Sequence, residues 1–207
     1  MFKLYAKKGA GSAAVEAILA LCGANYEIED LQRDASGSFP PILHSVNPRA
    51  EVPTLLLPDG TIMTESAAIL IHLADIFPEA KLAPAVSSRL RPRYLRWMLY
   101  LATTVYMSDL RMYYPARYTI DAAGAAGIKA KAIDGMEAEF AILSDAIGEG
   151  PFILGSAMSA VDIYAAMLAT WVVDVPALFA KHPNIKMLHD RVAEVPPVAK
   201  VRVRNGM

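Results

Sequence analysis

The first residues whose spacing could support chemistry form a glycine-rich turn near the start of the chain. Gly9, Gly11 and Ala14 match the G-x-G-x-x-A form of a dinucleotide-binding turn, and Asp30 follows where a ribose-binding acid is expected. Such a turn directs the free N–H groups of a helix N-terminus at an anion. The turn therefore holds either a pyrophosphate or another negatively charged group.

A second candidate site lies in the stretch NPRAEVPTLLLPDGTIMTES, residues 47–66. Pro53 directly precedes a predicted strand, where it has no N–H to give to a sheet. A cis Val52–Pro53 peptide would leave the N–H and C=O of Val52 free to pair with an extended peptide. A trans proline that begins an edge strand explains the same residues, so both interpretations stay open.

Thr64, Glu65 and Ser66 lie where the next helix is predicted to begin. Successive main-chain N–H groups and the Ser66 hydroxyl would bind a carboxylate, assisted by the helix dipole, while Glu65 would bind an ammonium group. Together these groups suit the head group of an amino acid. The alternative is ordinary capping by Thr64, with Glu65 stabilised in the first turn by the same dipole.

Two regions with different hydrophobic patterns must position these residues. The first predicts the order β-α-β-(α)-β-β-α, with strands over 2–6 and 25–31, a hairpin over 52–64, and helices over 13–22 and 65–77. The second shows only helical patterns, over 93–114, 128–147, 161–173 and 185–195. We therefore expect an α/β domain over 1–78, a linker over 79–86 and an all-helical domain over 87–207.

This layout argues against a dinucleotide-binding fold, which needs several parallel strands joined by crossover helices. The predicted hairpin makes two of the strands antiparallel, and the second region supplies no strand. Lys7 and Lys8 also separate the first strand from Gly9, where a tight strand-to-helix turn would be expected. The turn is therefore predicted to face a different anionic group.

The chain as a whole resembles the cytosolic glutathione transferase family, of the bacterial type. The stretch NPRAEVPTLLLPDGTIMTESAAIL is similar to the glutathione-binding segment of bacterial members, and GSAMSAVDIYAAML resembles the capping box of the family's helical domain. The resemblance implies a thioredoxin-like first domain with cis Pro53, followed by a helical bundle. It also implies that Val52 pairs with the cysteinyl unit of glutathione, while Glu65 and Ser66 hold the γ-glutamyl end.

A transferase must hold the glutathione sulfur as a thiolate near pH 7, although a free thiol has a pKa of about 8.5. A helix dipole contributes only ~0.3–1 kcal/mol, so a hydrogen-bond donor should complete the site. The cysteine of the beta-type enzymes aligns with Gly11. The predicted donors are Ser12 in the turn and Tyr5, at the place of the catalytic tyrosine of other classes. Main-chain N–H groups of residues 10–12 and the Tyr106 hydroxyl remain alternatives.

The remaining site predictions concern the rest of glutathione and its reaction partner. The basic candidates for binding the glycyl carboxylate are Arg33, His44 and Arg49. The predicted glutathione site comprises Ala10, Gly11, Ser12, Arg33, Arg49, Glu51, Val52, Pro53, Glu65 and Ser66. The acceptor pocket is expected between the domains, lined by Tyr106, Arg111, Tyr113 and Tyr114, and suited to an apolar electrophile with a polar handle.

Composition narrows the function classes further. With 55 % hydrophobic residues, 20 % charged residues and a net charge of −1, the chain of 207 residues is predicted to bind neither nucleic acid nor membrane. The single cysteine, Cys22, excludes an internal disulfide framework and is predicted to be a core residue. The four histidines show no ligand spacing, so no metal is expected. Because no signal peptide is recognised, a cytosolic location is predicted.

These observations lead to one main functional hypothesis and two alternatives. The main hypothesis is a homodimeric glutathione S-transferase that conjugates the glutathione thiolate, as co-substrate, to a small apolar electrophile. The first alternative is a glutathione-dependent peroxidase, isomerase or ether-cleaving enzyme on the same scaffold. The second is a non-catalytic glutathione-binding module.

Overall fold

The computed structural model describes residues 1–207 and divides into two compact units. The first unit combines Met1–Ala85 with Ala193–Met207, and the second comprises Val86–Val192. The sequence predicts a helical domain over 87–207, whereas the structure groups the last fifteen residues with the first unit.

A four-stranded mixed sheet with the strand order β2-β1-β3-β4 forms the centre of the first unit. The strands are β1 (Phe2–Ala6), β2 (Tyr26–Asp30), β3 (Thr54–Leu56) and β4 (Ile62–Met63). Strand β1 pairs in parallel with β2 and antiparallel with β3, and β3 pairs antiparallel with β4. The predicted hairpin and the thioredoxin-like order of elements are therefore confirmed.

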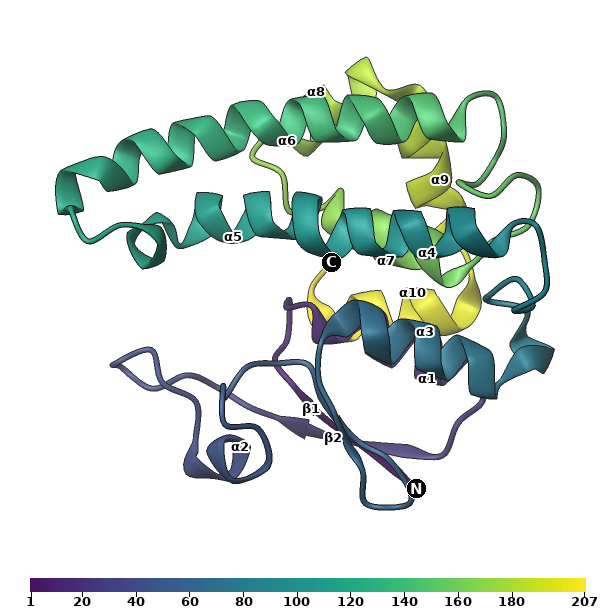
Figure 1. Ribbon diagram of the computed structural model, residues 1–207, viewed down its shortest axis with the longest axis horizontal. Coiled ribbons are helices and arrows are strands. Elements are labelled where there is room, and N and C mark those ends of the chain that lie inside the picture. The colour runs from purple at the N-terminus through teal and green to yellow at the C-terminus, as the bar shows by residue number, and fades with distance from the viewer. The chain divides into compact units, whose positions relative to one another are not determined.

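Helices cover both faces of this sheet (Figure 1). Helices α1 and α3 lie on one face and α2 on the other, as alternation along β1 requires, because successive strand side chains point to opposite faces. Leu4 and Leu55 are fully buried, and Tyr5 joins a separate apolar cluster with Leu43 of α2. The helices of this unit are α1 (Ser12–Leu21), α2 (Pro41–Val46), α3 (Ser66–Ile76), the short η1 (Pro78–Ala80) and α10 (Pro196–Asn205).

Helix α10 packs against α1, and a buried ion pair explains why it belongs to the first unit. Arg204 makes two hydrogen bonds to the carboxylate of Glu16, both of 2.7 Å, and a third of 2.6 Å to Asp30. Glu16 lies on α1 and is only 3 % exposed. A buried carboxylate needs such a partner, and here the partner comes from the other end of the chain.

The second unit is entirely helical, as predicted. The expected helix over 93–114 contains a π-helical segment, η2, between α4 and α5, and the helix expected over 161–173 already ends at Leu168. Its elements are α4 (Arg91–Tyr100), η2 (Leu101–Val105), α5 (Tyr106–Tyr113), η3 (Pro115–Tyr118), η4 (Ala122–Gly124), α6 (Ala125–Ile147), α7 (Ala160–Leu168), α8 (Val175–Lys181) and the first ten residues of α9 (Pro183–Ala193).

The predicted capping box at the start of α7 is present. Ser159 and Asp162 exchange reciprocal bonds, and the Asp162 carboxylate accepts the N–H of Ser159 at 2.7 Å. The other carboxylate oxygen accepts the N–H of Ile153 at 2.8 Å. Burial raises the pKa of Asp162 to about 6, although these hydrogen bonds favour its ionised form. The box thus ties the preceding loop to the first turn of the helix.

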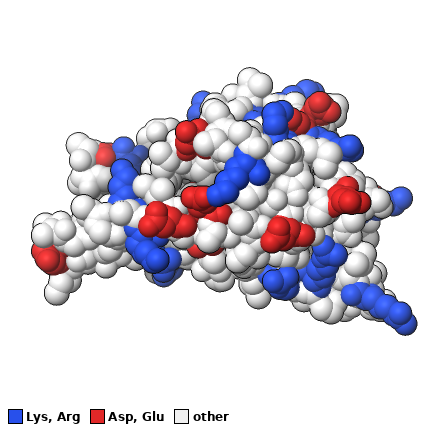
Figure 2. All heavy atoms as spheres, turned by 90° about the horizontal axis from the view of Figure 1, so that it is seen from above, with Lys and Arg blue, Asp and Glu red and all other residues white.

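None of the helices has both the length and the apolar character needed to span a membrane. No three His, Cys, Asp or Glu side chains lie close enough together to hold a metal ion. On the face shown in Figure 2, Lys and Arg side chains lie among Asp and Glu side chains without forming a broad area of one sign.

Candidate functional site

The turn between β1 and α1 ends in two main-chain N–H groups, those of Gly11 and Ser12, that lie free at the start of the helix. Earlier in the turn, the N–H of Ala10 bonds to the carbonyl of Lys7 at 3.2 Å, and the N–H of Gly9 bonds to Asn205 at 3.3 Å. The N–H groups of Gly11 and Ser12 have no acceptor in the structure. Helix α1 begins here without a side-chain cap, so these two donors are available to an anion.

The Ser12 hydroxyl is occupied within the turn. It donates to the carbonyl of Lys7 at 3.0 Å and accepts the N–H of Lys7 at 3.2 Å, and Ser12 is 1 % exposed. Donation to a thiolate would first have to break the bond to that carbonyl, because a hydroxyl has only one proton. The catalytic role of Ser12 therefore stays a prediction, and the hydrogen bond to Lys7 competes with it.

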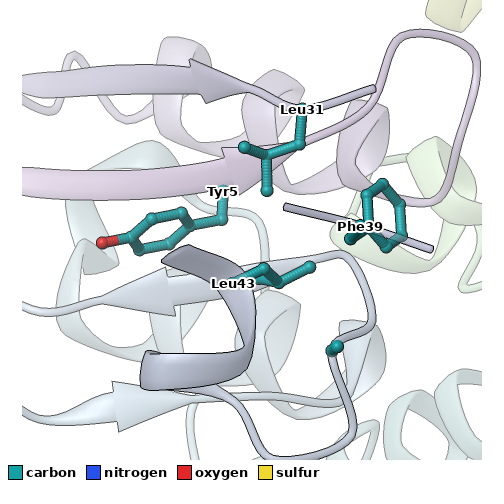
Figure 3. Packing of buried hydrophobic residues seen from close by; sticks show 5 residues of the cluster. Tyr5, Leu31, Phe39 and Leu43 are labelled. Carbon is teal, nitrogen blue, oxygen red and sulfur yellow. The ribbon is translucent and has the colours of Figure 1, made fainter. Parts of the chain in front are cut away.

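Tyr5 lies on the α2 side of the sheet, among Leu31, Phe39 and Leu43 (Figure 3). Its ring is buried in this cluster, and its hydroxyl points away from Leu31 and Phe39. The ammonium group of Lys3 lies 5.5 Å from the ring centroid. Tyr5 thus serves as a core aromatic, and its role as a donor to sulfur stays a prediction.

The Val52–Pro53 peptide is cis, which resolves the two interpretations left open by the sequence. Val52 makes no main-chain hydrogen bond in the structure, so its N–H and C=O are open to an extended partner. Asn47 braces the loop before it, because its amide donates to the carbonyl of Glu51 at 3.1 Å and to the Thr54 hydroxyl at 2.9 Å. Both Asn47 and Thr54 are buried. The sequence analysis missed Asn47, although an Asn-Pro pair is a turn signal.

Helix α3 begins at Ser66 without a side-chain cap, so the alternative of ordinary capping by Thr64 is wrong. The residue that leads into the helix is Glu65, whose φ of +66° and ψ of 105° are unusual for a non-glycine residue. Such a conformation costs roughly 1–3 kcal/mol and is concentrated at functional sites. The N–H groups of Ala67 and Ala68 have no acceptor, which leaves this helix start open to a carboxylate.

The predicted basic residues of the glutathione site are engaged close by in the chain. Arg49 forms an exposed ion pair with Glu51 at 3.2 Å, and hydrogen bonding to this carboxylate raises the pKa of Arg49. Arg33 stacks on Phe39 at 4.0 Å and donates to the carbonyl of Gly37. The exposed ion pair between Arg49 and Glu51 contributes little to stability, so Arg49 can leave Glu51 for a ligand carboxylate at little cost. Both arginines stay candidates for a carboxylate.

The four predicted acceptor residues all lie in the second unit and differ in the residues they contact, although the rings of Tyr113 and Tyr114 also lie 6.5 Å apart. Tyr106 packs against Trp171 with ring centroids 5.4 Å apart, and the Tyr113 hydroxyl donates to the Trp171 carbonyl at 2.8 Å. Arg111 instead lies 5.5 Å from the ring centroid of Tyr118, and Tyr114 packs under Arg117. Tyr106 and Tyr113 therefore share a partner, whereas Arg111 and Tyr114 lie against η3.

A buried acidic residue that the sequence analysis missed lies on the same helix as these aromatics. Asp109 is 1 % exposed, and neither of its carboxylate oxygens has a hydrogen-bond partner. Burial, with a smaller contribution from nearby Glu139, raises the pKa of Asp109 to about 8. Glu139 accepts a hydrogen bond of 2.7 Å from Ser108, and burial also raises its pKa. In the sequence, the one sign of this buried carboxyl group is an aspartate within the largely apolar helix predicted over 93–114.

Cys22 lies half-buried at the end of α1. Burial, assisted by the negative charge of Glu79, raises the pKa of its thiol to about 11. Nucleophilic cysteines need a lowered pKa, so the raised pKa argues against a nucleophilic role for Cys22.

Family models match both halves of the chain. The model described as "Glutathione S-transferase, N-terminal domain" matches residues 12–76, and the one described as "Glutathione S-transferase, C-terminal domain" matches residues 113–202. The chain is also 30 % identical to the uncharacterized GST-like protein YncG of Escherichia coli K12, over 99 % of this chain and 98 % of that protein. The chain belongs to the glutathione S-transferase family.

Other members of the glutathione S-transferase family align along nearly the whole chain. Glutathione S-transferase GstA of Escherichia coli O157:H7 is 27 % identical over 99 % of each chain. A glutathione transferase homologue from Sulfitobacter, solved with bound glutathione, has a TM-score of 0.90 at 25 % identity, covering 100 % of this chain and 99 % of its own. A sphingomonad glutathione S-transferase complexed with glutathione has a TM-score of 0.84 at 27 % identity, covering 99 % of each chain.

Proposed function

We propose that this family member is a glutathione S-transferase that activates the glutathione thiol mainly with main-chain N–H groups. The observation that carries the proposal is the pair of free donors at Gly11 and Ser12, at the start of an uncapped helix. The open main chain of Val52 would pair with the cysteinyl unit. Similar proteins that were solved with bound glutathione support this choice of ligand.

The other end of glutathione fits the start of α3. Its γ-glutamyl group carries a carboxylate and an ammonium group on one carbon. The free N–H groups of Ala67 and Ala68, together with the Ser66 hydroxyl, suit the carboxylate. The neighbouring Glu65 carboxylate suits the ammonium group. The conformation of Glu65, outside the usual regions for non-glycine residues, supports a role in ligand binding.

The energetics of thiolate formation are compatible with main-chain donors. Lowering a thiol pKa from about 8.5 to about 6.5 requires roughly 2.7 kcal/mol of preferential stabilisation of the thiolate. A hydrogen bond to a charged group contributes roughly 1.5–3 kcal/mol, and the helix dipole adds ~0.3–1 kcal/mol. Two donors at Gly11 and Ser12 therefore suffice without a side-chain hydroxyl. Holding thiolate and electrophile together would provide most of the remaining rate enhancement.

The electrophile is proposed to be small and largely apolar. The aromatic group of Tyr106 and Trp171 supports an apolar acceptor surface, and the Arg111 side chain supports a polar handle. We further propose a homodimer, as is usual in the family.

A non-catalytic glutathione-binding module is a second candidate function, because no cysteine occupies the turn and the Ser12 hydroxyl is already engaged. The two functions differ in one measurable quantity, the ionisation state of bound glutathione. Reduced glutathione should bind by calorimetry, and the ultraviolet absorbance of the thiolate in the complex should titrate one to two pH units below that of free glutathione. Binding without a lowered thiol pKa would establish the module, and no binding at all would refute both functions.

A further inference from the structure

The turn that carries the two free N–H groups is held from the far end of the chain. The N–H of Gly9 donates to the side-chain carbonyl of Asn205, the last residue of α10, at 3.3 Å. Asn205 is 6 % exposed and 196 positions away in sequence. The hydrogen bond therefore connects the C-terminal helix directly to the segment before α1.

Asn205 itself is fixed by two donated hydrogen bonds. Its amide nitrogen donates to the Glu16 carboxylate at 3.0 Å and to the carbonyl of Val201 at 2.9 Å. Glu16 is in turn held by two bonds from Arg204. With three bonds made by one buried amide, the carbonyl that faces Gly9 has a single orientation.

The main-chain conformation of Gly9 allows this close contact with Asn205. Its φ of +69° lies in the region that favours glycine, and a Cβ at this position would lie 3.6 Å from the main-chain oxygen of Asn205. The turn thus approaches the end of α10 closely, and Gly9 precedes the free donor of Gly11 by only two residues.

We propose that Asn205 is a positioning residue of the thiolate site, acting through the N–H of Gly9 to hold the Gly11 and Ser12 donors. This inference rests on the proposed function, because it concerns the same two N–H groups. Asn205 does not touch the sulfur. It holds the turn at Gly9, while the two bonds between Ser12 and Lys7 join the beginning and the end of the turn.

The physical reason is the directional character of hydrogen bonds to a charged acceptor. Such a bond weakens steeply as its angle departs from linearity, so a small rotation of the turn removes part of the stabilisation of the thiolate. Neutral glutathione depends much less on these donors. Loss of the Asn205 contact should therefore raise the thiol pKa in the complex more than it weakens binding.

The test compares wild type with Asn205→Ala, which removes the acceptor for Gly9. We expect the pKa of the bound glutathione thiol to rise by roughly half a pH unit or more, for a partial loss of one charge-assisted bond. We also expect kcat/KM with a model aryl halide at pH 6.5 to fall several-fold, while KM for glutathione stays within twofold.

Two control variants separate positioning from general destabilisation. Val203→Ala alters an 81 % exposed side chain on the same helix and should leave both the thiol pKa and the stability unchanged. Ser159→Ala removes the capping box in the second unit, so it lowers stability without touching the turn. A shift of similar size in Ser159→Ala, or no shift in Asn205→Ala, would overturn the role of Asn205.

Two further measurements on the wild-type protein test the proposal even if Asn205→Ala fails to fold. Amide hydrogen exchange of wild type should be at least tenfold slower at Gly9 than at Lys8, whose N–H has no acceptor, after correction for intrinsic rates. Equal exchange would refute the contact even if Asn205→Ala fails to fold. Calorimetry with reduced glutathione on wild type tests the proposed function separately, because absent binding refutes that function, whereas binding with an unchanged variant pKa refutes only the positioning role.

Discussion

Replacing Asp109 with asparagine should change how the stability of the second unit depends on pH. The carboxyl group is buried without a hydrogen-bond partner, and its pKa in the native state is raised to about 8, from 3.8. The unfolded chain releases this proton near pH 4, so between about pH 4 and pH 8 the native state binds more protons. Stability therefore falls as pH rises across this window.

The size of the effect follows from the two pKa values. Each pH unit inside the window costs up to about 1.4 kcal/mol, which amounts to roughly 4 kcal/mol between pH 4 and pH 7. Asparagine cannot ionise, so Asp109→Asn removes this slope while keeping the side chain polar and similar in size. Above about pH 8 and below about pH 4 the contribution of Asp109 is constant, and the two curves should run parallel.

Tryptophan fluorescence can follow the unfolding of the second unit, because both tryptophans of the chain, Trp97 and Trp171, lie in that unit. Urea unfolding followed by tryptophan fluorescence at pH 5.5, 6.5 and 7.5 should show Asp109→Asn gaining on wild type by about 1 kcal/mol per pH unit. Asp134→Asn, at an exposed position of α6, is the matched control and should follow wild type. A constant difference between Asp109→Asn and wild type across this range would refute the raised pKa.

Three other predictions concern glutathione binding and stability. Ser66→Ala should raise the dissociation constant of reduced glutathione about tenfold by calorimetry, because a hydrogen bond to a charged group is lost. An unchanged constant would remove Ser66 from the site. Arg204→Met should lower the free energy of unfolding by roughly 3 kcal/mol because it leaves the buried Glu16 carboxylate without its cationic partner, and adding Glu16→Met should recover most of this loss in urea denaturation. If the double variant is no more stable than the single one, the pair is not the cause. Ser159→Ala should cost about 1–2 kcal/mol in the same assay, whereas the exposed control Ser156→Ala should cost little. Equal losses in both serine variants would argue against the capping box.

Much of the fold could be predicted from the sequence because its signals are local. The alternating pattern over residues 25–31, the Pro-Asp-Gly hairpin and the Ser159–Asp162 box each depend on neighbouring residues, and the structure contains the strand, the hairpin and the box. The place of α10 could not be predicted in this way. The position of α10 depends on the hydrogen bonds between Arg204 and Glu16, which lie 188 positions apart in the sequence. A local sequence pattern contains no information on such a distant pair.

The main-chain conformation of the candidate site could be predicted from the sequence, but the hydrogen bonds and the burial of its side chains could not. The Val52–Pro53 turn and the start of α3 were both expected, because proline and helix termini constrain the main chain directly. The sequence showed a serine at position 12 but not that its proton is donated to Lys7, since the closure of a turn depends on its dihedral angles. The burial of Asp109 was hidden for a similar reason, because an aspartate within an amphipathic helix is usually exposed.

The protonated state of Cys22 makes this chain a convenient subject for chemical labelling. With a thiol pKa of about 11, only about one in ten thousand of these sulfur atoms is ionised at pH 7. An alkylating reagent added at neutral pH would consequently react with a bound tripeptide thiolate and leave the polypeptide almost unmodified. The pH dependence of alkylation would then follow the ionisation of the ligand thiol, with no need to remove the native cysteine first.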